Sequence, residues 1–356
     1  MTSQHSFAFL VHPRAELAQD LGRLWSPLRR LPERFCDTAL RRLALPPISM
    51  ARVHIGGTAV GHVVLVPFGA RHLLAAPAQG RERVNRAVDK AVALGATVVG
   101  LGALTATVTG GGISLRRRSD IGVTNGNAYT AAVVDTQVRR LLDDPRFGAT
   151  GRRVAVIGAS GSVGSAVTML LARDAAVDGL TLIARSRPRL DSVAARVRGQ
   201  VPTSVSGELA DAATADLIVL LSASADALLR PEHLAPGAVV LDATQPRNTS
   251  PELCVRRPDV LVVDGGVVDI PSLRLVGGDI GLPAGRAYAC FAETAMLALA
   301  GHRGHFCLGA PDLAQVQRAR LMADELGALG FGPAVPTSFG VPLAFDRSRQ
   351  PQRIAS

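Results

Sequence analysis

The alternation of apolar and polar positions is clearest between residues 153 and 173. Val154 to Ile157 form a short, mostly β-branched apolar run, which is typical of a buried parallel strand. A glycine ends the run, and apolar residues then recur at helical spacing as far as Arg173. The pattern therefore predicts a strand, a tight turn and a helix in direct succession.

Similar segments alternate along most of the chain. Strands are predicted at 6–11, 60–67, 97–101, 180–184, 217–221, 238–242 and 260–264, and helices at 81–94, 284–300 and 312–329, with a further helix that follows the loop at 124–130 and runs to Leu142. This alternation predicts an α/β protein with a Rossmann-type, doubly wound parallel sheet.

The division into domains follows from where the segments and the linker fall. A polar, proline-containing linker at 143–148 separates an N-terminal α/β substrate domain, residues 1–149, from a Rossmann domain, residues 150–283. Residues 284–356 are predicted to form a C-terminal helical segment that ends in a mobile tail.

The turn after the first strand of the second domain has phosphate-binding character. Gly158 permits a tight turn, Gly161 lets the backbone approach a pyrophosphate, and Gly164 lets helix and strand pack closely. The positive end of the helix dipole then favours the phosphates. The spacing is GxxGxxG rather than GxGxxG, and a glycine turn in an unrelated α/β fold is the alternative interpretation.

The end of the next strand indicates the cofactor. A carboxylate there would bind the ribose 2′-hydroxyl of NAD, whereas the chain has Arg185-Ser186-Arg187, whose guanidinium groups pair with a 2′-phosphate. The prediction is NADPH. The predicted cofactor contacts are Gly158, Ser160, Gly161, Ser162, Val163, Arg185, Ser222 and Gly265.

Composition and charge exclude several classes of protein. The net charge is +10, but it comes almost wholly from arginine, and aromatic residues make up only 4% of the chain. A nucleic-acid-binding surface with stacking aromatics is therefore not expected. The four cysteines lack metal-ligand or disulfide spacing, so no metal is predicted. No apolar run has membrane-spanning length and no secretion signal is present, which makes the cytoplasm the expected location.

Cys290 is the candidate nucleophile. In the helix predicted at 284–300 it lies near the N-terminus, with Arg286 one turn earlier, and both features favour thiolate over thiol. The alternative is that Cys290 is an inert, small apolar residue on a packed helix face.

Two loops of the first domain are candidates for a substrate or oxyanion site. Thr105 follows a predicted strand, and Asn125 and Asn127 flank a glycine in the loop before the helix that runs to Leu142. Asn127 is a suitable N-cap, so a turn with a cap explains the same residues equally well.

These segments resemble a known family, the cyanobacterial long-chain acyl–acyl carrier protein reductases. The resemblance extends from Leu73 to about Leu329 and is most specific at Ala289-Cys290-Phe291-Ala292-Glu293. In that family the matching cysteine takes the acyl group. The resemblance implies that Cys290 is the catalytic nucleophile and that NADPH reduces a fatty acyl thioester to a fatty aldehyde.

The resemblance also implies the partners: acyl carrier protein or acyl-CoA as the acyl donor, with an aldehyde-consuming enzyme and transient membrane contact both compatible with a poorly soluble product. Two alternatives stay open at this stage. One is an NADP-dependent dehydrogenase of the shikimate or amino-acid type, which acts on a small carbonyl without a covalent step. The other is a non-catalytic NADP-sensing protein that binds an acyl carrier.

Overall fold

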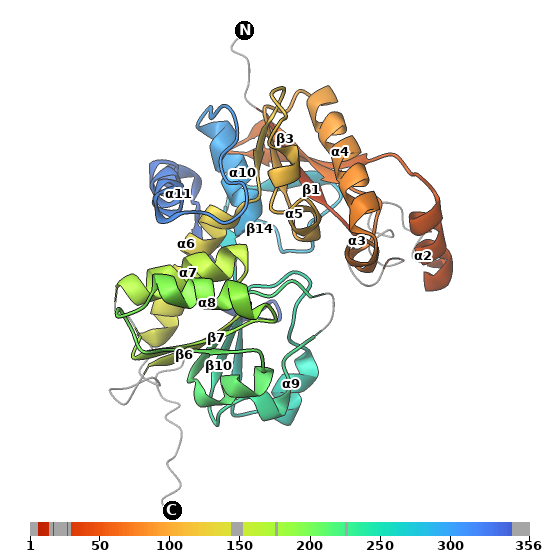
Figure 1. The fold of residues 1–356 in the computed structure, drawn as a ribbon. Helices are drawn as coiled ribbons and strands as arrows, with labels where there is room; N and C mark the ends of the chain where they lie inside the picture. Colours follow the sequence, from red (N-terminus) through yellow and green to blue (C-terminus); the bar gives the residue numbers. More distant parts are fainter. Residues whose placement is uncertain are drawn as a thin grey trace, which may run out of the picture.

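The computed structural model describes residues 6–13, 17, 27, 30–143, 152–174, 177–224 and 227–343. Nearly all of the expected linker, and the tail beyond 343, lie outside these described residues. Figure 1 shows two bodies, with the helices α6 and α7 where they meet. Within the described residues, no helix is both long enough and apolar enough to cross a lipid bilayer.

The second body is built on a parallel sheet. Its strands are β6 (Arg153–Ile157), β7 (Gly179–Ile183), β8 (Thr203–Ser206), β9 (Leu217–Leu220), β10 (Val239–Asp242) and β11 (Leu261–Asp264). They lie in the order β11-β10-β9-β6-β7-β8, all parallel. From β6 the next strands are added toward one edge of the sheet, and from β9 toward the other edge. The strand order therefore reverses between β6 and β9, which confirms the predicted Rossmann-type fold.

Three helices lie in this body, of which only the first, α7, was predicted from the sequence. They are α7 (Ser162–Arg173), α8 (Arg187–Arg196) and α9 (Pro251–Arg256). Short 3₁₀ turns lie at Leu209–Thr214 and Pro231–His233 here, and at Ile113–Leu115 and Gly327–Leu329 elsewhere.

The first body has a mixed sheet in the order β13-β2-β3-β1-β4-β5. Its strands are β1 (Phe7–Val11), β2 (Ile48–Ile55), β3 (Thr58–Leu65), β4 (Val98–Leu101), β5 (Gly122–Thr124) and β13 (Arg274–Gly277). The pattern predicted β1, β3 and β4 but not β2 or β13, which pair antiparallel at one edge. Helices α2 (Glu33–Arg42), α3 (Ala70–Ala75), α4 (Pro77–Ala93) and α5 (Leu104–Val108) belong to the same body.

The mixed sheet is covered on both faces. On one face Val84, Val88 and Ala91 of α4 pack against alternate residues of β1 and β4. On the other face lies α10 (Ala289–Leu299), whose Phe291 contacts Phe7 and Phe9 edge to face at 5.4 and 5.2 Å between ring centroids. Aromatic pairs of this geometry stabilise a core by about 0.5–1.5 kcal/mol each beyond simple burial. Helix α10 is thus fixed to the sheet.

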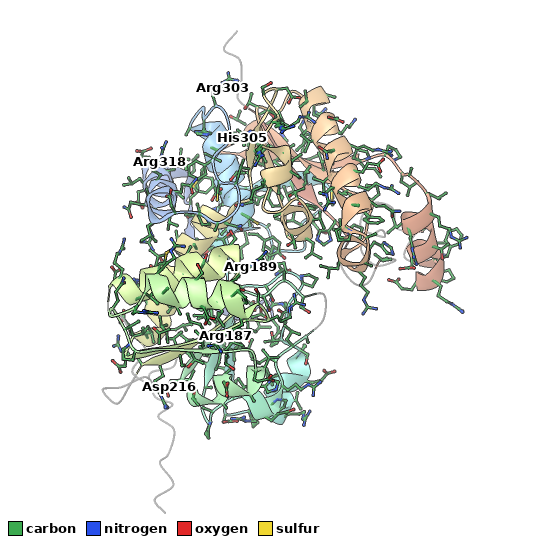
Figure 2. The ribbon with its side chains drawn as sticks, viewed as in Figure 1. Arg187, Arg189, Asp216, Arg303, His305 and Arg318 are labelled. Atoms are coloured by element: carbon green, nitrogen blue, oxygen red, sulfur yellow. The ribbon has the colours of Figure 1, made fainter. Side chains whose placement is uncertain are left out.

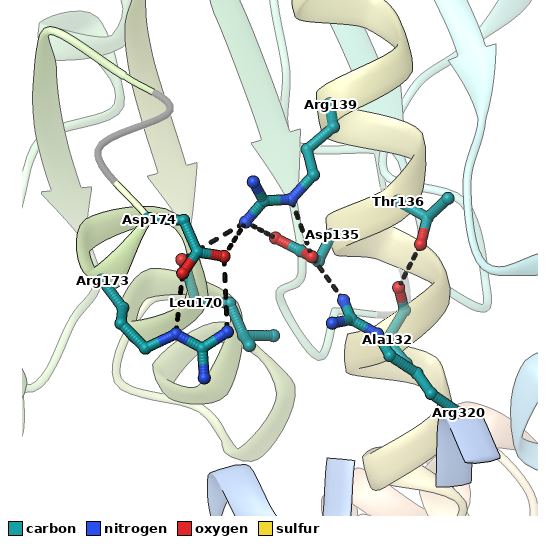
Figure 3. Close-up of polar contacts among 8 residues, drawn as sticks. All are labelled: Ala132, Asp135, Thr136, Arg139, Leu170, Arg173, Asp174 and Arg320. Atoms are coloured by element: carbon teal, nitrogen blue, oxygen red, sulfur yellow. Dashed lines mark hydrogen bonds and ion pairs between the residues drawn. The ribbon is translucent and has the colours of Figure 1, made fainter. Parts of the chain in front are cut away.

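A buried ionic cluster holds the helices where the two bodies meet (Figure 3). Asp135 of α6 (Asn127–Leu142) is 1% exposed and accepts hydrogen bonds from Arg139, at 3.0 Å, and from Arg320 of α11 (Leu313–Glu325). Arg139 also bonds Asp174, at 2.7 Å, just beyond α7. The cluster therefore links α6, α7 and α11, and two guanidinium groups together compensate the buried charge of Asp135.

Short strands complete the fold. β12 (Val267–Asp269) pairs antiparallel with both β14 (Arg286–Tyr288) and β15 (Gly332–Pro333). β16 (Thr337–Ser338) and β17 (Val341–Pro342) form a hairpin, which Asp264 binds through Thr337 and two backbone N–H groups. The three-part domain division stays a prediction.

The predicted helix at 284–300 is wrong at its start. Gly285 has φ 76°, a left-handed conformation that a continuous helix does not allow, and residues 286–288 form β14. Arg286 therefore lies on a strand, where it bonds Asp269 at 3.1 Å. It is not one helical turn before Cys290, so the expected support for a thiolate from Arg286 is absent.

The contact between α10 and the mixed sheet yields a stability prediction. A Cβ at Gly100 would lie 2.0 Å from Oγ1 of Thr294 and 2.8 Å from the Phe9 ring, so Gly100→Ala is expected to lower the free energy of unfolding by about 1–3 kcal/mol. Thr294→Ala in the same chain removes the clashing atoms and should restore part of the loss. Urea unfolding measures both effects.

Gly207→Ala is the matched control, because nothing lies within 4 Å of a Cβ there. Its effect should stay within about 0.5 kcal/mol. A Gly100→Ala variant as stable as Gly207→Ala would contradict the close packing of α10.

Candidate active site

One cavity of about 260 Å³ lies between the two bodies. Val163, Ser222 and Gly265 line it from the nucleotide-binding body, at the carboxyl ends of β6, β9 and β11. Asn127 and Cys290 line it from the other side. The cavity thus opens at the point where strand order reverses, which is where ligands bind in folds of this type.

The glycine turn after β6 fits a dinucleotide. Gly158 has φ 91°, and a Cβ there would lie 2.7 Å from backbone atoms of Leu221 and Ser222. A Cβ on Gly164 would lie 2.2 Å from the carbonyl oxygen of Gly158, so helix and turn pack as predicted. At Gly161 a Cβ would meet only two carbonyl oxygens, at 3.0 and 3.9 Å, so the turn is open on that side.

The other predicted cofactor residues lie around this turn. Ser160 is half-buried in the turn, and Arg185 is exposed directly after β7, at the carboxyl edge of the sheet. Arg187, at the start of α8, bonds Asp191 at 2.8 Å, and both Arg187 and Arg189 are labelled in Figure 2. Arg185 therefore has the exposure and position that a 2′-phosphate contact needs.

Ser162 joins the two bodies. Its hydroxyl donates to the carbonyl oxygen of Gly309 at 2.6 Å and accepts from Nδ2 of Asn127 at 2.8 Å. Asn127 is the first residue of α6 rather than its cap, since Gly126 with φ 74° precedes the helix. The cavity-lining amide of Asn127 is thereby held next to the start of α7.

Asn125 lines the cavity as predicted, and its amide also holds the loop. Its Nδ2 donates to the carbonyl oxygens of Gly111 and Gly309 at 2.9 and 2.8 Å, and its Oδ1 accepts from the backbone N–H of Asn127. Both amide hydrogens are thus engaged. Thr105, a further predicted site residue, is fully buried and donates to the carbonyl oxygen of Gly102, while its neighbours Leu104 and Ala106 line the cavity.

Cys290 is the second residue of α10 and lies against the cavity wall. It packs so closely on Gly126 that a Cβ at Gly126 would lie 2.2 Å from the Cβ of Cys290. Burial, and then the nearby Glu293 carboxylate, raise the pKa of the Cys290 thiol to about 12, while the N–H groups of Phe291 and Cys290 act in the opposite direction. The free protein therefore holds Cys290 as a thiol at neutral pH, in contrast to the lowered pKa expected from its place near a helix start.

Glu293 connects α10 to the loop that carries Asn125 and Asn127. Its side chain is fully buried; it accepts hydrogen bonds from the Thr124 hydroxyl and, at 2.7 Å, from the backbone N–H of Tyr129. Burial raises the pKa of Glu293 to about 7, against the lowering effect of these donors and of the N–H groups of Gly126 and Ala128. Glu293 thus caps the N-terminus of α6 from a neighbouring helix.

Several cavity residues carried no signal in the sequence. His12 follows β1, is 9% exposed, and its Nε2 accepts from the backbone N–H of Leu104 at 3.2 Å. Met50 and Ile280 line the apolar side of the cavity. Isolated residues of these types, far apart in the sequence, form no motif, so only the fold brings them together.

The two histidines after α10, His302 and His305, contact backbone groups and a neighbouring aromatic ring. His305, labelled in Figure 2, accepts from the N–H of Val123 at 3.1 Å and contacts the carbonyl oxygen of Arg116 through its other nitrogen. His302 stacks edge to face on Phe306. Neither lines the cavity among the described residues.

Glu293 should make stability depend on pH. Its pKa is raised from 4.5 to about 7, so the folded state binds a proton more tightly than the unfolded state between these values. Its contribution to the free energy of unfolding, about 3 kcal/mol, is complete below 4.5 and is lost as pH rises through 7. Glu293→Gln removes this titration, so its stability relative to wild type should increase with pH.

Urea unfolding across this pH range measures the difference, with the exposed Glu252→Gln as the control. A difference curve for Glu293→Gln that is flat with pH would contradict the raised pKa.

Comparisons with known proteins agree with this geometry. Residues 153–263 match the semialdehyde dehydrogenase family in its NAD-binding domain. The chain is 27% identical over 320 residues to the aminotransferase PigE of a Serratia species, which covers 85% of this chain and 37% of that protein. It is 30% identical over 213 residues to the long-chain acyl-[acyl-carrier-protein] reductase of Synechococcus elongatus, over 58% of each chain.

The chain therefore spans 37% and 58% of the lengths of these two curated relatives. Among solved structures, ligand-free 5-ketofructose reductase of a Gluconobacter strain shares 12% identity over 90% of this chain and 99% of that chain, with a TM-score of 0.37. The NAD-binding domain match, the strand order and the glycine turn together identify residues 153–263 as a Rossmann-type NAD-binding domain.

Proposed function

We propose that this chain reduces a long-chain acyl thioester to a fatty aldehyde through an acyl group bound to Cys290. The observation that supports the proposal most is that the Cys290 wall and the nucleotide-side loops at Ser222 and Gly265 line the same cavity. The 30% identity to a protein named long-chain acyl-[acyl-carrier-protein] reductase agrees with it.

In the first step the Cys290 sulfur forms a bond to the acyl carbon, and the bond from that carbon to the donor sulfur breaks. The proton that leaves Cys290 ends on the donor thiol, so no external acid or base is consumed. Because the pKa of Cys290 is about 12 in the free protein, attack requires the proton to leave as the thioester binds.

The carbonyl oxygen of the thioester needs hydrogen-bond donors as it becomes negative. The backbone N–H groups of Cys290 and Phe291 lie at the N-terminus of α10 and approach the Cys290 sulfur. The Nδ2 of Asn127 lines the same cavity, with one hydrogen directed at Ser162. These groups are the proposed oxyanion donors, and Asn125 positions Asn127.

The cofactor of the proposed reaction is NADPH. Gly158, Ser160, Gly161, Ser162 and Val163 would hold its pyrophosphate, and Ser222 and Gly265 its nicotinamide end. Arg185 would bind the 2′-phosphate. When bound, the reduced nicotinamide supplies the hydride that turns the acyl thioester into an aldehyde and releases the Cys290 sulfur.

The donor and the consumer of the product are part of the same proposal. Phe9, Val11 and Met50 give the cavity an apolar side that suits an acyl chain, and the chain would arrive on acyl carrier protein or coenzyme A. The relative named an aminotransferase aligns over only 37% of its length. Aminotransferases act on carbonyl compounds, so an enzyme of that class is a fitting consumer of the aldehyde.

A second candidate has one observation in its favour. A thiol with a pKa of about 12 is a poor nucleophile, as expected in an NADP-dependent dehydrogenase that reduces a small carbonyl directly. In that enzyme the Cys290 side chain would contribute only to the packing of the cavity wall.

Acylation of Cys290 distinguishes the two candidates. When the protein is mixed with a long-chain acyl thioester without NADPH, intact mass spectrometry should show one acyl group, mapped to Cys290. Cys290→Ala should lose both the adduct and aldehyde formation, by at least about 1000-fold in turnover. Cys254→Ala, in the other body, should keep both.

An adduct that disappears with aldehyde formation when NADPH is added supports the acyl route. Normal turnover by Cys290→Ala would contradict the acyl route and favour the dehydrogenase that acts on a small carbonyl.

Cofactor preference tests Arg185. Loss of a charge-assisted contact to the 2′-phosphate costs about 1.5–3 kcal/mol, so Arg185→Ala should bind NADPH roughly 10- to 100-fold more weakly, with little effect on NADH. Fluorescence titration with each nucleotide measures this, with Arg256→Ala as the control. Equal weakening for both nucleotides would show that Arg185 does not read the phosphate.

A further inference from the structure

Helix α2 has an exposed face that combines large apolar and basic side chains. Phe35 is 59% exposed and Leu43, which ends the helix, is 52% exposed. Arg34, Arg41 and Arg42 are exposed on the same helix. Eight other large apolar side chains are exposed among the described residues, and such residues are normal when they stand alone, so the feature of interest here is that Phe35 and Leu43 lie among three arginines.

Helix α2 is attached to the body by apolar packing and by two polar contacts. Cys36 and Leu40 are buried in a small apolar cluster with Leu17, and Leu31 and Leu45 pack against it. Asp37 contacts His72, and the carbonyl oxygen of Leu43 accepts from Arg83 at 2.9 Å. Helix α2 lies at the outer end of the first body, beyond α3 (Figure 1).

The basic charge on this face is not neutralised within the described residues. The two carboxylates of the helix are engaged elsewhere: Asp37 contacts His72 of α3 at 2.8 Å, and Glu33 accepts from the backbone N–H of Leu17. No described residue forms an ion pair with Arg34, Arg41 or Arg42. The face thus presents three positive charges around a phenyl and a leucyl side chain.

We propose that the outer face of α2, formed by Arg34, Phe35, Arg41, Arg42 and Leu43, binds an anionic phospholipid surface. Exposed aromatic and leucyl side chains together with arginines are typical of helices that lie in the headgroup region of a membrane. The apolar side chains enter the acyl boundary while the guanidinium groups bind lipid phosphates. This inference does not depend on the proposed reaction.

Vesicle sedimentation of the full-length protein tests the proposal. The wild type should sediment with vesicles of phosphatidylcholine and phosphatidylglycerol, and much less with phosphatidylcholine alone. The triple variant R34Q/R41Q/R42Q should lower the partition coefficient for anionic vesicles by roughly 100-fold. The double variant F35S/L43S should lower it as well, and high salt should release the wild type.

The matched control is R189Q/R196Q/R198Q, which removes the same charge from exposed arginines at and after α8 in the other body. It should bind anionic vesicles like the wild type, and circular dichroism should show that every variant is folded. All the changed side chains are exposed, so folding is expected to persist.

Three results would overturn the proposal. One is wild-type protein that stays in solution with anionic vesicles. Another is equal loss of binding in the α2 and α8 variants, which would show a general charge effect. The third is α2-dependent binding to an acidic acyl carrier protein, or to a second copy of this chain by light scattering, without vesicle binding.

Discussion

The buried carboxylate of Glu293 is the contact on which the geometry of the site depends. It joins α10, which lies on the mixed sheet, to Thr124 at the end of β5 and to the first N–H groups of α6. Those elements carry Cys290, Asn125 and Asn127. The packing of Gly126 on Cys290 is a second contact that holds the cysteine against the asparagine loop. A charge-bearing group at a helix N-terminus is stabilised there, which compensates part of the cost of burying it.

Each of the two bodies around this contact supplies a different part of the candidate site. The parallel sheet supplies a glycine turn and loops that suit a dinucleotide, and the mixed sheet supplies the wall with Cys290 and the apolar side of the cavity. Ser162 and the Asp135 cluster fix the two bodies to each other at opposite ends of the α6–α7 contact. The site therefore lies at a boundary that is held by buried polar bonds, and small shifts there would separate the nucleotide side from the cysteine.

Local sequence patterns predicted what depends on local sequence. The glycine turn, five of the six strands of the parallel sheet (all but β8) and the helix that ends at Leu142 follow from short-range periodicity and from the glycines themselves. The start of α10 was missed because β14 exists only through its pairing with β12, more than fifteen residues earlier. The pKa of Cys290 was predicted in the wrong direction for a related reason: burial by distant residues, which the sequence does not display, outweighs the helix N-terminus.

The sheet order of the first body has a consequence for synthesis on the ribosome. Its edge strand β13 comes from residues 274–277, and the helix that covers one face ends at Leu299, whereas every strand of the parallel sheet lies between 153 and 264. The nucleotide-binding sheet is thus an insertion between two parts of the other body. The first body is synthesised first but is completed last, because its core includes β13 and α10, which follow the insertion in the chain. During translation, Phe7 and Phe9 stay without their partner Phe291 until the whole parallel sheet has emerged.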